Sequence, residues 1–194
     1  MVRLPAALLI TALALSGCGI SGPTFKNTDI TGADYGKDFT LTGHDGKVRT
    51  LADFRGKVVV MFFGYTHCPD VCPTTLAELK AVKDRLGEDG KRMQVLFVTI
   101  DPERDTPKLL AHYVPAFDPD FLGLYGDPAA VARVAKDFRV FYQKVPGTTP
   151  DSYTMDHTAG SYVFDPQGRL RLFAREGNSA NLAADIQTLL RTSG

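Results

Sequence analysis

Continuous hydrophobic runs alternate with amphipathic stretches along most of this chain. Residues 57–64 and 95–100 are almost wholly apolar and rich in β-branched and aromatic side chains, a pattern typical of strands buried on both faces of a sheet. Between these runs, apolar residues recur at helical spacing, with charged residues on the other side. The apolar positions of this segment are Leu76, Leu79, Val82 and Leu86. The pattern therefore predicts a buried strand, a helix and a second buried strand in succession.

Capping residues indicate three further helix starts. Thr106 precedes Pro107, and Asp127 precedes Pro128. In each pair, a side chain that can accept a hydrogen bond from the first turn is followed by proline, which suits the first helical position. A last amphipathic segment begins at residue 178 or 179, and it predicts a C-terminal helix.

Short alternating segments complete the pattern. Residues 39–42 and 48–51 flank a glycine-bearing turn, which predicts a hairpin ahead of the first buried strand. Residues 161–164 and 170–173 flank another turn and predict an antiparallel pair near the C-terminus. Because strands and helices alternate between these pairs, we expect an α/β fold with a mixed central sheet, flanked by helices and preceded by a β-hairpin.

Composition narrows the classes of function. The chain has 194 residues, of which 44% are hydrophobic and 23% charged, and its 22 basic residues balance 22 acidic ones. This composition is that of a globular protein with one α/β domain. Without a basic excess there is no electrostatic basis for nucleic-acid binding, and we expect none. We also expect the protein to be a monomer.

The N-terminus has the features of an export signal. Arg3 is followed by an apolar run over residues 6–15 and by Leu-Ser-Gly-Cys, which ends at Cys18. Such a run is too short to span a bilayer, which takes about 20 residues, and a short apolar region after a positive charge is typical of a cleaved signal. The ending resembles a bacterial lipobox, which implies cleavage before Cys18 and a lipid on its sulfur. An ordinary secretory signal, with no role for Cys18, is the alternative.

This interpretation divides the chain into three parts. Residues 1–17 are expected to be a lipoprotein signal peptide, residues 18–37 a flexible tether carrying lipidated Cys18, and residues 38–194 the folded domain. The protein would then be an extracytoplasmic, membrane-anchored lipoprotein on the periplasmic or cell-surface face. In an oxidising compartment, two nearby thiols form a disulfide unless a metal or a reductant intervenes.

The two remaining cysteines, Cys68 and Cys72, lie between the first buried strand and the helix that follows it. The carboxyl end of a strand in an α/β sheet is a common place for ligand sites. If Pro73 is the first helical residue, Cys72 lies near the N-cap, where the helix dipole favours a thiolate. The spacing allows either a disulfide or a shared metal, and thiolate ligands favour Cu(I) or Zn(II) over Mg²⁺ or Ca²⁺.

A metal held by two thiolates needs a further ligand. The candidates are His44, His67, His112, His157 and the methionines, among them Met155. We expect His44 and His112 to be solvated, and His67 adjoins a cysteine, so that the two side chains rarely point at one centre. His157 lies in a predicted loop ahead of the strand at residue 161, where Asp156 or Asp151 could orient its ring by accepting a hydrogen bond.

Three segments resemble the signatures of the SCO/SenC family. They are residues 62–73 (FFGYTHCPDVCP), residues 99–107 (TIDPERDTP) and residues 156–158 (DHT). The resemblance covers roughly residues 38–192 and implies a thioredoxin-like fold, membrane tethering, and one copper ion, Cu(I) or Cu(II), held by Cys68, Cys72 and His157. It also implies a role in assembling the binuclear copper centre of cytochrome c oxidase, either by delivering copper or by reducing the cysteines of that centre.

The function implied by this resemblance is that of a copper metallochaperone. Its partners would be the copper-bearing subunit of cytochrome c oxidase and an upstream periplasmic copper donor or thiol reductant. The alternative is a thiol–disulfide oxidoreductase with a redox-active Cys68–Cys72 disulfide. Against it, the three-residue spacer differs from C-x-x-C and His157 would be idle. A peroxidase resembling peroxiredoxins would need Pro seven residues and Thr or Ser three residues before the reactive cysteine, and neither cysteine has this pair. A catalytic zinc site lacks an evident general base.

Overall fold

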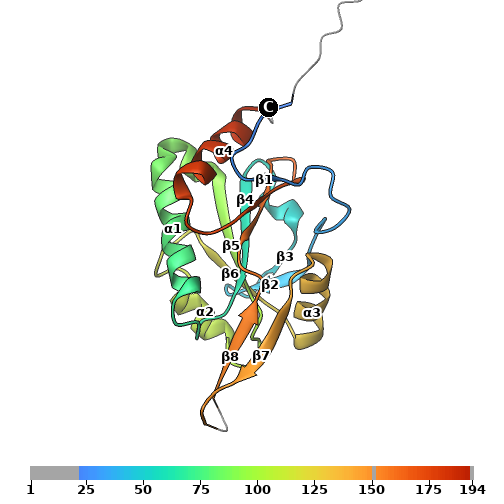
Figure 1. Ribbon diagram of the computed structural model, residues 1–194, viewed down its shortest axis with the longest axis vertical. Coiled ribbons are helices and arrows are strands. Elements are labelled where there is room, and N and C mark those ends of the chain that lie inside the picture. Colours follow the sequence, from blue (N-terminus) through green and yellow to red (C-terminus); the bar gives the residue numbers. More distant parts are fainter. Residues whose placement is uncertain (1–21, 150–151, 193–194) are drawn as a thin grey trace, which may run out of the picture.

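A mixed sheet of eight strands forms the centre of the part of the molecule that the computed structural model describes, residues 22–149 and 152–192 (Figure 1). The strand order is β1-β10-β9-β4-β5-β6-β2-β3; β4 pairs with β5 and β5 with β6 in parallel, and the other neighbours are antiparallel. The strands are β1 (Thr28–Asp29), β2 (Leu41–Gly43), β3 (Val48–Arg49), β4 (Val58–Gly64), β5 (Met93–Thr99), β6 (Leu122–Tyr125), β9 (Ser161–Phe164) and β10 (Leu170–Ala174).

Helices cover both faces of this sheet (Figure 1). The long helices α1 and α4 pack against each other on one face, and α3 lies on the opposite face. The helices are α1 (Val71–Arg85), α2 (Pro107–Tyr113), α3 (Pro128–Asp137) and α4 (Ser179–Thr192), with 3-10 turns η1 (Leu51–Phe54) and η2 (Gly87–Arg92). This α/β arrangement, with its mixed central sheet, confirms the prediction from the sequence pattern, and it is thioredoxin-like, as the family resemblance implied.

The two continuous apolar runs form the central parallel pair. Every residue of β4 and β5 is buried, which confirms the prediction of strands covered on both faces. Their register runs from Val58 opposite Met93 to Gly64 opposite Thr99, so both strands end at the same edge of the sheet. The Ile100 N–H donates to the Gly64 carbonyl over 2.9 Å. The loops that follow β4 and β5 therefore start side by side.

The predicted helix caps are confirmed. The Thr106 hydroxyl accepts a hydrogen bond from the Leu109 N–H, and the Asp127 carboxylate accepts one from the Ala130 N–H. The start of α1 differs from the prediction, because the helix begins at Val71. The Thr74 N–H donates to the carbonyl of Asp70, the N-cap residue, over 3.1 Å. Cys72 therefore lies inside the first turn of the helix.

The segment expected to be a flexible tether, residues 18–37, is docked on the domain in the part that the structure describes. Strand β1 pairs with the edge strand β10. The N–H groups of Lys26 and Asn27 each donate to the carboxylate of Asp185 on α4 over 2.8 Å. Asp185 is buried and needs donors, and the polar composition of the segment gave no sign of this acceptor 158 residues away.

A second, two-stranded sheet projects from the domain. Strands β7 (Tyr142–Pro146) and β8 (Tyr153–His157) form an antiparallel hairpin (Figure 1). In its register Tyr142 lies opposite His157. The prediction of a loop around residue 157 is therefore wrong. No residue of β7 and one residue of β8, Met155, is buried, and a hairpin without a buried face lacks the alternating pattern by which strands are predicted.

Two of the sequence-based expectations fall outside the described residues. Cys18 and the expected signal peptide lie ahead of residue 22, and Asp151 belongs to the undescribed residues 150–151. In the ranges that are described, none of the helices combines the length and the apolarity needed to cross a membrane.

Candidate metal centre

Cys68 and Cys72 lie at the carboxyl edge of the sheet, where β4 passes into α1. Both are free thiols; Cys68 is partly exposed and Cys72 is fully buried. The Cys68 N–H donates to the Tyr65 carbonyl over 3.3 Å, and the Cys72 N–H donates to Cys68 Sγ over 3.4 Å. The turn and the first helical turn together place the two side chains next to each other, as the spacing predicted.

Gly64 makes room for the buried sulfur. A Cβ atom at this position would lie 2.9 Å from Cys72 Sγ and 2.9 Å from ring atoms of Phe62 and Phe97. All three of these side chains are fully buried. Only a residue without a side chain therefore allows α1 to bring the Cys72 sulfur this close to the end of β4.

His157 reaches the same edge from the end of β8. Its Nε2 lies 3.8 Å from Cys72 Sγ, although the two residues are 85 positions apart. The imidazole packs edge-on against the rings of Phe62 and Tyr65, with centroids 6.3 and 6.2 Å away. Nδ1 lies 3.0 Å from the Thr158 carbonyl oxygen. Because a carbonyl only accepts, Nδ1 carries the proton of this hydrogen bond, which leaves Nε2 as the nitrogen that faces the sulfur.

The acceptor for His157 is not the one expected. Asp156 is exposed and adjoins His157 on an extended strand, so the two side chains point to opposite faces of β8. The main-chain oxygen of Thr158 orients the ring instead. Asp151 lies outside the described residues. A main-chain acceptor leaves no mark in residue types, which is why the sequence suggested a carboxylate.

The other candidate ligands lie elsewhere. Met155 is buried and packs in the hydrophobic core, and His112 is exposed on α2. His44 was expected to be solvated, but its Nδ1 accepts a hydrogen bond from the Gly123 N–H over 3.0 Å. His67 points toward Thr66, whose hydroxyl lies 3.1 Å from Nδ1. Of the four histidines, the structure brings His157 to the cysteines.

Burial controls the protonation of Cys72. It raises the pKa of this thiol far above its usual value, although a hydrogen bond from the main chain at Tyr65 acts in the opposite direction. The expectation that the helix dipole would favour a thiolate here is therefore wrong for the metal-free protein. Cys72 lies in the first turn of α1 with its side chain buried, and the loss of hydration is the largest effect on its pKa. Cys68 is the more accessible of the two sulfurs.

The separation of the donor atoms suits a shared ion. With metal–sulfur and metal–nitrogen bonds of about 2.3 and 2.0 Å at an angle of about 120°, the sulfur and nitrogen ligands of one ion lie about 3.7 Å apart. The observed distance from Cys72 Sγ to His157 Nε2 is 3.8 Å. Among the described residues, no three His, Cys, Asp or Glu side chains already enclose one point closely enough to hold a metal.

The sequence matches a protein-family model and several curated proteins. The family model SCO1/SenC matches residues 27–191. The chain is 41% identical over 150 residues to the mitochondrial protein SCO2 homolog of Bos taurus, covering 76% of this chain and 56% of that protein. It is 38% identical over 159 residues to the human mitochondrial protein SCO1 homolog, covering 80% of this chain and 53% of that protein. The chain thus spans about half the length of these curated relatives.

Solved structures with copper show the same fold. Bradyrhizobium japonicum ScoI with copper bound is 44% identical, with a TM-score of 0.70 over 77% of this chain and 96% of that one. Yeast Sco1 with copper bound is 30% identical, with a TM-score of 0.74 over 82% of this chain and 90% of that one. The matched segment contains β1 through α4 except its last residue, and with it Cys68, Cys72 and His157. The chain belongs to the SCO1/SenC family.

Proposed function

We propose that this chain is a membrane-tethered copper metallochaperone that binds one copper ion, Cu(I) or Cu(II), through Cys68, Cys72 and His157. The observation that carries the proposal is the 3.8 Å distance between Cys72 Sγ and His157 Nε2, with Cys68 Sγ beside Cys72. The two sulfurs are soft donors, and together with an imidazole nitrogen they suit copper. Relatives that are 44% and 30% identical have been solved with copper bound, which supports copper as the cargo.

The three ligands differ in exposure, and this suits a site that takes up and releases its ion. Cys72 is buried against the end of β4, while Cys68 is partly exposed at the surface. His157 stands on a hairpin outside the main sheet. A partner can therefore reach the ion from the side of Cys68, with Cys72 as the ligand that is exchanged last. A site with few ligands, one of them accessible, favours transfer over permanent storage.

The recipient in this proposal is the copper-bearing subunit of cytochrome c oxidase, whose binuclear centre needs copper and reduced cysteines. An upstream periplasmic copper donor or thiol reductant would load or reduce the site. Lipid on Cys18 would hold the protein at the membrane, on the face where the recipient centre is assembled. In cells, Cys18→Ser should move the protein from the membrane fraction to the soluble fraction, and membrane retention of this variant would contradict the lipid anchor.

Copper binding is tested by titrating the reduced domain, residues 22–194, with Cu(I) against a chromogenic chelator, and with zinc in competition. We expect one copper ion per chain and little displacement by zinc. His157→Ala should weaken binding by more than the roughly 10–100-fold that the loss of an outer hydrogen-bond partner costs. His112→Ala removes an exposed histidine on α2 and is the control. Equal affinity in the two variants would exclude His157 as a ligand.

The alternative function, thiol–disulfide exchange, is favoured by the two adjacent free thiols. In that reaction Cys68 and Cys72 would be oxidised to a disulfide, and two electrons and two protons would reduce a disulfide of the target. His157→Ala separates the two functions, because it removes a copper ligand and leaves both thiols. A variant that restores cysteine reduction in the oxidase but not copper loading would favour the alternative.

A further inference from the structure

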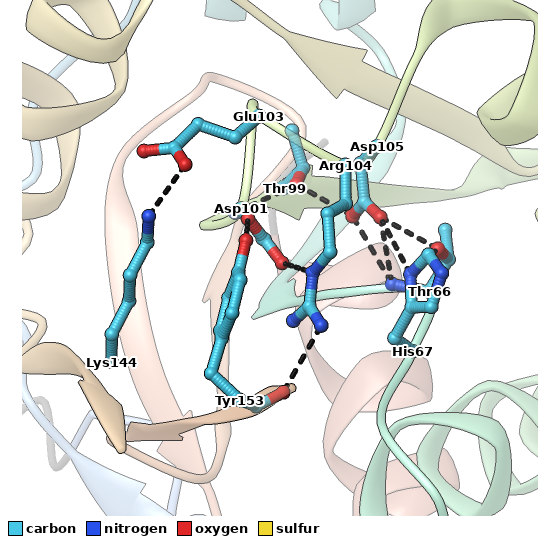
Figure 2. A network of polar contacts seen from close by, with 9 residues as sticks. All are labelled: Thr66, His67, Thr99, Asp101, Glu103, Arg104, Asp105, Lys144 and Tyr153. Atoms are coloured by element: carbon cyan, nitrogen blue, oxygen red, sulfur yellow. Dashed lines mark hydrogen bonds and ion pairs between the residues drawn. The ribbon is translucent and has the colours of Figure 1, made fainter. Parts of the chain in front are cut away.

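The loop between β5 and α2 contacts both segments that carry the proposed ligands (Figure 2). It contains most of the second family signature, and the metal centre described above uses none of its side chains. Two of them, Asp101 and Asp105, are 1% and 2% exposed. A buried carboxylate is costly unless hydrogen bonds satisfy its oxygens, so the partners of these two groups indicate what the loop is built to hold.

Asp105 holds the segment that leads to the cysteines. It accepts hydrogen bonds from the Thr66 N–H over 3.1 Å and from the Thr66 hydroxyl over 2.6 Å, and a third from the Thr99 hydroxyl over 2.7 Å (Figure 2). Thr66 lies two residues before Cys68, and Thr99 ends β5. Asp105 therefore joins the start of the cysteine turn to the end of the neighbouring strand.

Asp101 holds the hairpin that carries His157. One of its oxygens accepts a hydrogen bond from the Tyr153 hydroxyl over 2.8 Å, and the other pairs with Arg104 Nε at 2.5 Å. Arg104 in turn donates from Nη1 to the Tyr153 carbonyl over 3.0 Å, and its guanidinium stacks 3.5 Å from the centre of the Tyr153 ring (Figure 2). Tyr153 is the first residue of β8 and His157 the last. The side chain and the main chain of Tyr153 are thus both held, and with them the first residue of β8.

A third contact connects this pair to the imidazole. The Arg104 guanidinium lies 5.8 Å from the centre of the Tyr65 ring, on which His157 packs edge-on at 6.2 Å. Arg104 therefore lies between the hairpin and the aromatic side chain that supports the histidine. The contacts of one loop reach both the cysteine turn and the histidine.

We propose that Asp101, Arg104 and Asp105 form a two-armed positioning element that sets the distance between the cysteine sulfurs and the His157 imidazole. Asp105 fixes the cysteine turn through Thr66, and Asp101 with Arg104 fixes the hairpin through Tyr153. These are positioning residues, because they act through Cys68, Cys72 and His157. This positioning role rests on the proposed function only in the experiments that measure copper binding.

The first test uses the metal-free, reduced domain and does not depend on copper. Tyr153→Phe deletes one hydroxyl and leaves Asp101 with an unpaired buried oxygen, which costs on the order of a tenfold change in an equilibrium. We expect the amides of β7 and β8 to exchange with deuterium about tenfold faster, and those of β4 and β5 to be unchanged. Glu103→Gln, which breaks the exposed Glu103–Lys144 pair between the same loop and hairpin, is the matched control. Unchanged hairpin exchange in Tyr153→Phe would overturn the proposal.

The second test separates positioning from general stability. Tyr153→Phe is measured for Cu(I) affinity in the wild-type and in the His157→Ala background, with the chelator assay described above. If Tyr153 acts through His157, affinity falls about tenfold in the first background and does not change in the second. An equal loss in both backgrounds would show that the hydroxyl acts on the fold as a whole and would overturn the positioning role. Arg104→Lys keeps the charge without the fork of donors and should reproduce the loss.

The other arm is tested by Thr66→Val, which removes the hydroxyl donated to Asp105 and keeps the shape of the side chain. We expect faster exchange confined to residues 65–72, and a changed sulfur-to-Cu(II) absorption band in the loaded domain. A normal band and normal exchange would contradict this arm. If His157→Ala binds copper normally, the proposed ligand set fails, whereas the exchange measurements on metal-free protein still decide the positioning proposal.

Discussion

Gly64→Ala is the substitution by which the packing around the buried sulfur is most directly tested. The added Cβ would meet Cys72 Sγ and ring atoms of Phe62 and Phe97, each at 2.9 Å. None of these groups is the free end of a long side chain, because Cys72 is held by α1 and both rings are fully buried. Relief therefore requires a shift of α1 away from the sheet or a rotation of core rings.

The cost follows from two opposing effects. Overpacking a core by one methyl group costs about 1–3 kcal/mol. Replacing glycine by alanine restricts the unfolded chain and returns about 0.4–1 kcal/mol. We expect a net loss of about 1–2 kcal/mol, which at a urea m-value of about 2 kcal/mol/M lowers the unfolding midpoint by about 0.5–1 M.

The assay is urea unfolding of the reduced domain, followed by circular dichroism. Gly22→Ala is the control, because nothing lies within 4 Å of a Cβ at this position, and its midpoint should not fall. In a Cys72→Ala background the sulfur is absent, so the cost of Gly64→Ala should fall by about 0.5–1 kcal/mol. A midpoint of Gly64→Ala at or above that of the wild type would refute the packing argument, and an equal cost in both backgrounds would show that the rings alone resist the methyl group.

Three further predictions concern the fold. Thr106→Ala and Asp127→Ala each remove a cap that the structure shows and should each lower the free energy of unfolding by about 1 kcal/mol; no change in the urea midpoint would contradict the capping roles. Asp185→Ala removes the acceptor of the N-terminal segment and should make the bonds near residue 26 accessible to trypsin, whereas a cleavage rate equal to that of the wild type would show that β1 alone holds the segment. Burial raises the pKa of Tyr162 to about 12. The stability contributed by its neutral form is therefore fully present below the unfolded-state pKa of about 10 and is lost as pH rises through about 12, so Tyr162→Phe should lose less stability than the wild type over this range in urea titrations.

Much of the site was evident from local sequence. The C-x-x-x-C spacing at the end of an apolar run placed Cys68 and Cys72 together, because the turn and the first helical turn are formed by neighbouring residues. Residue types alone left His157 as one candidate of several, and the family resemblance singled it out. The helix starts at residues 107 and 128 were predictable for the same local reason, since each cap and its partner lie three residues apart.

Three of the errors involve contacts that are distant in sequence or that leave no pattern in the residue types. The acceptor for His157 is the Thr158 carbonyl, which any residue type would supply. The docking of residues 26–27 depends on Asp185, far along the chain. The β7–β8 hairpin has too few buried positions to show an alternating pattern.

Local sequence by itself determined most elements of this protein: the buried central strands, the capped helix starts and the paired thiols follow from residues within a few positions of one another, where steric and hydrogen-bonding preferences act directly. Tertiary structure alone decided the distance between Cys72 and His157, the protonation of the buried Cys72 thiol, and the place of Asp101 and Asp105 between the two ligand-bearing segments. These properties depend on burial and on contacts between segments 39–85 residues apart, and such contacts exist only once the sheet has brought the ends of its strands together.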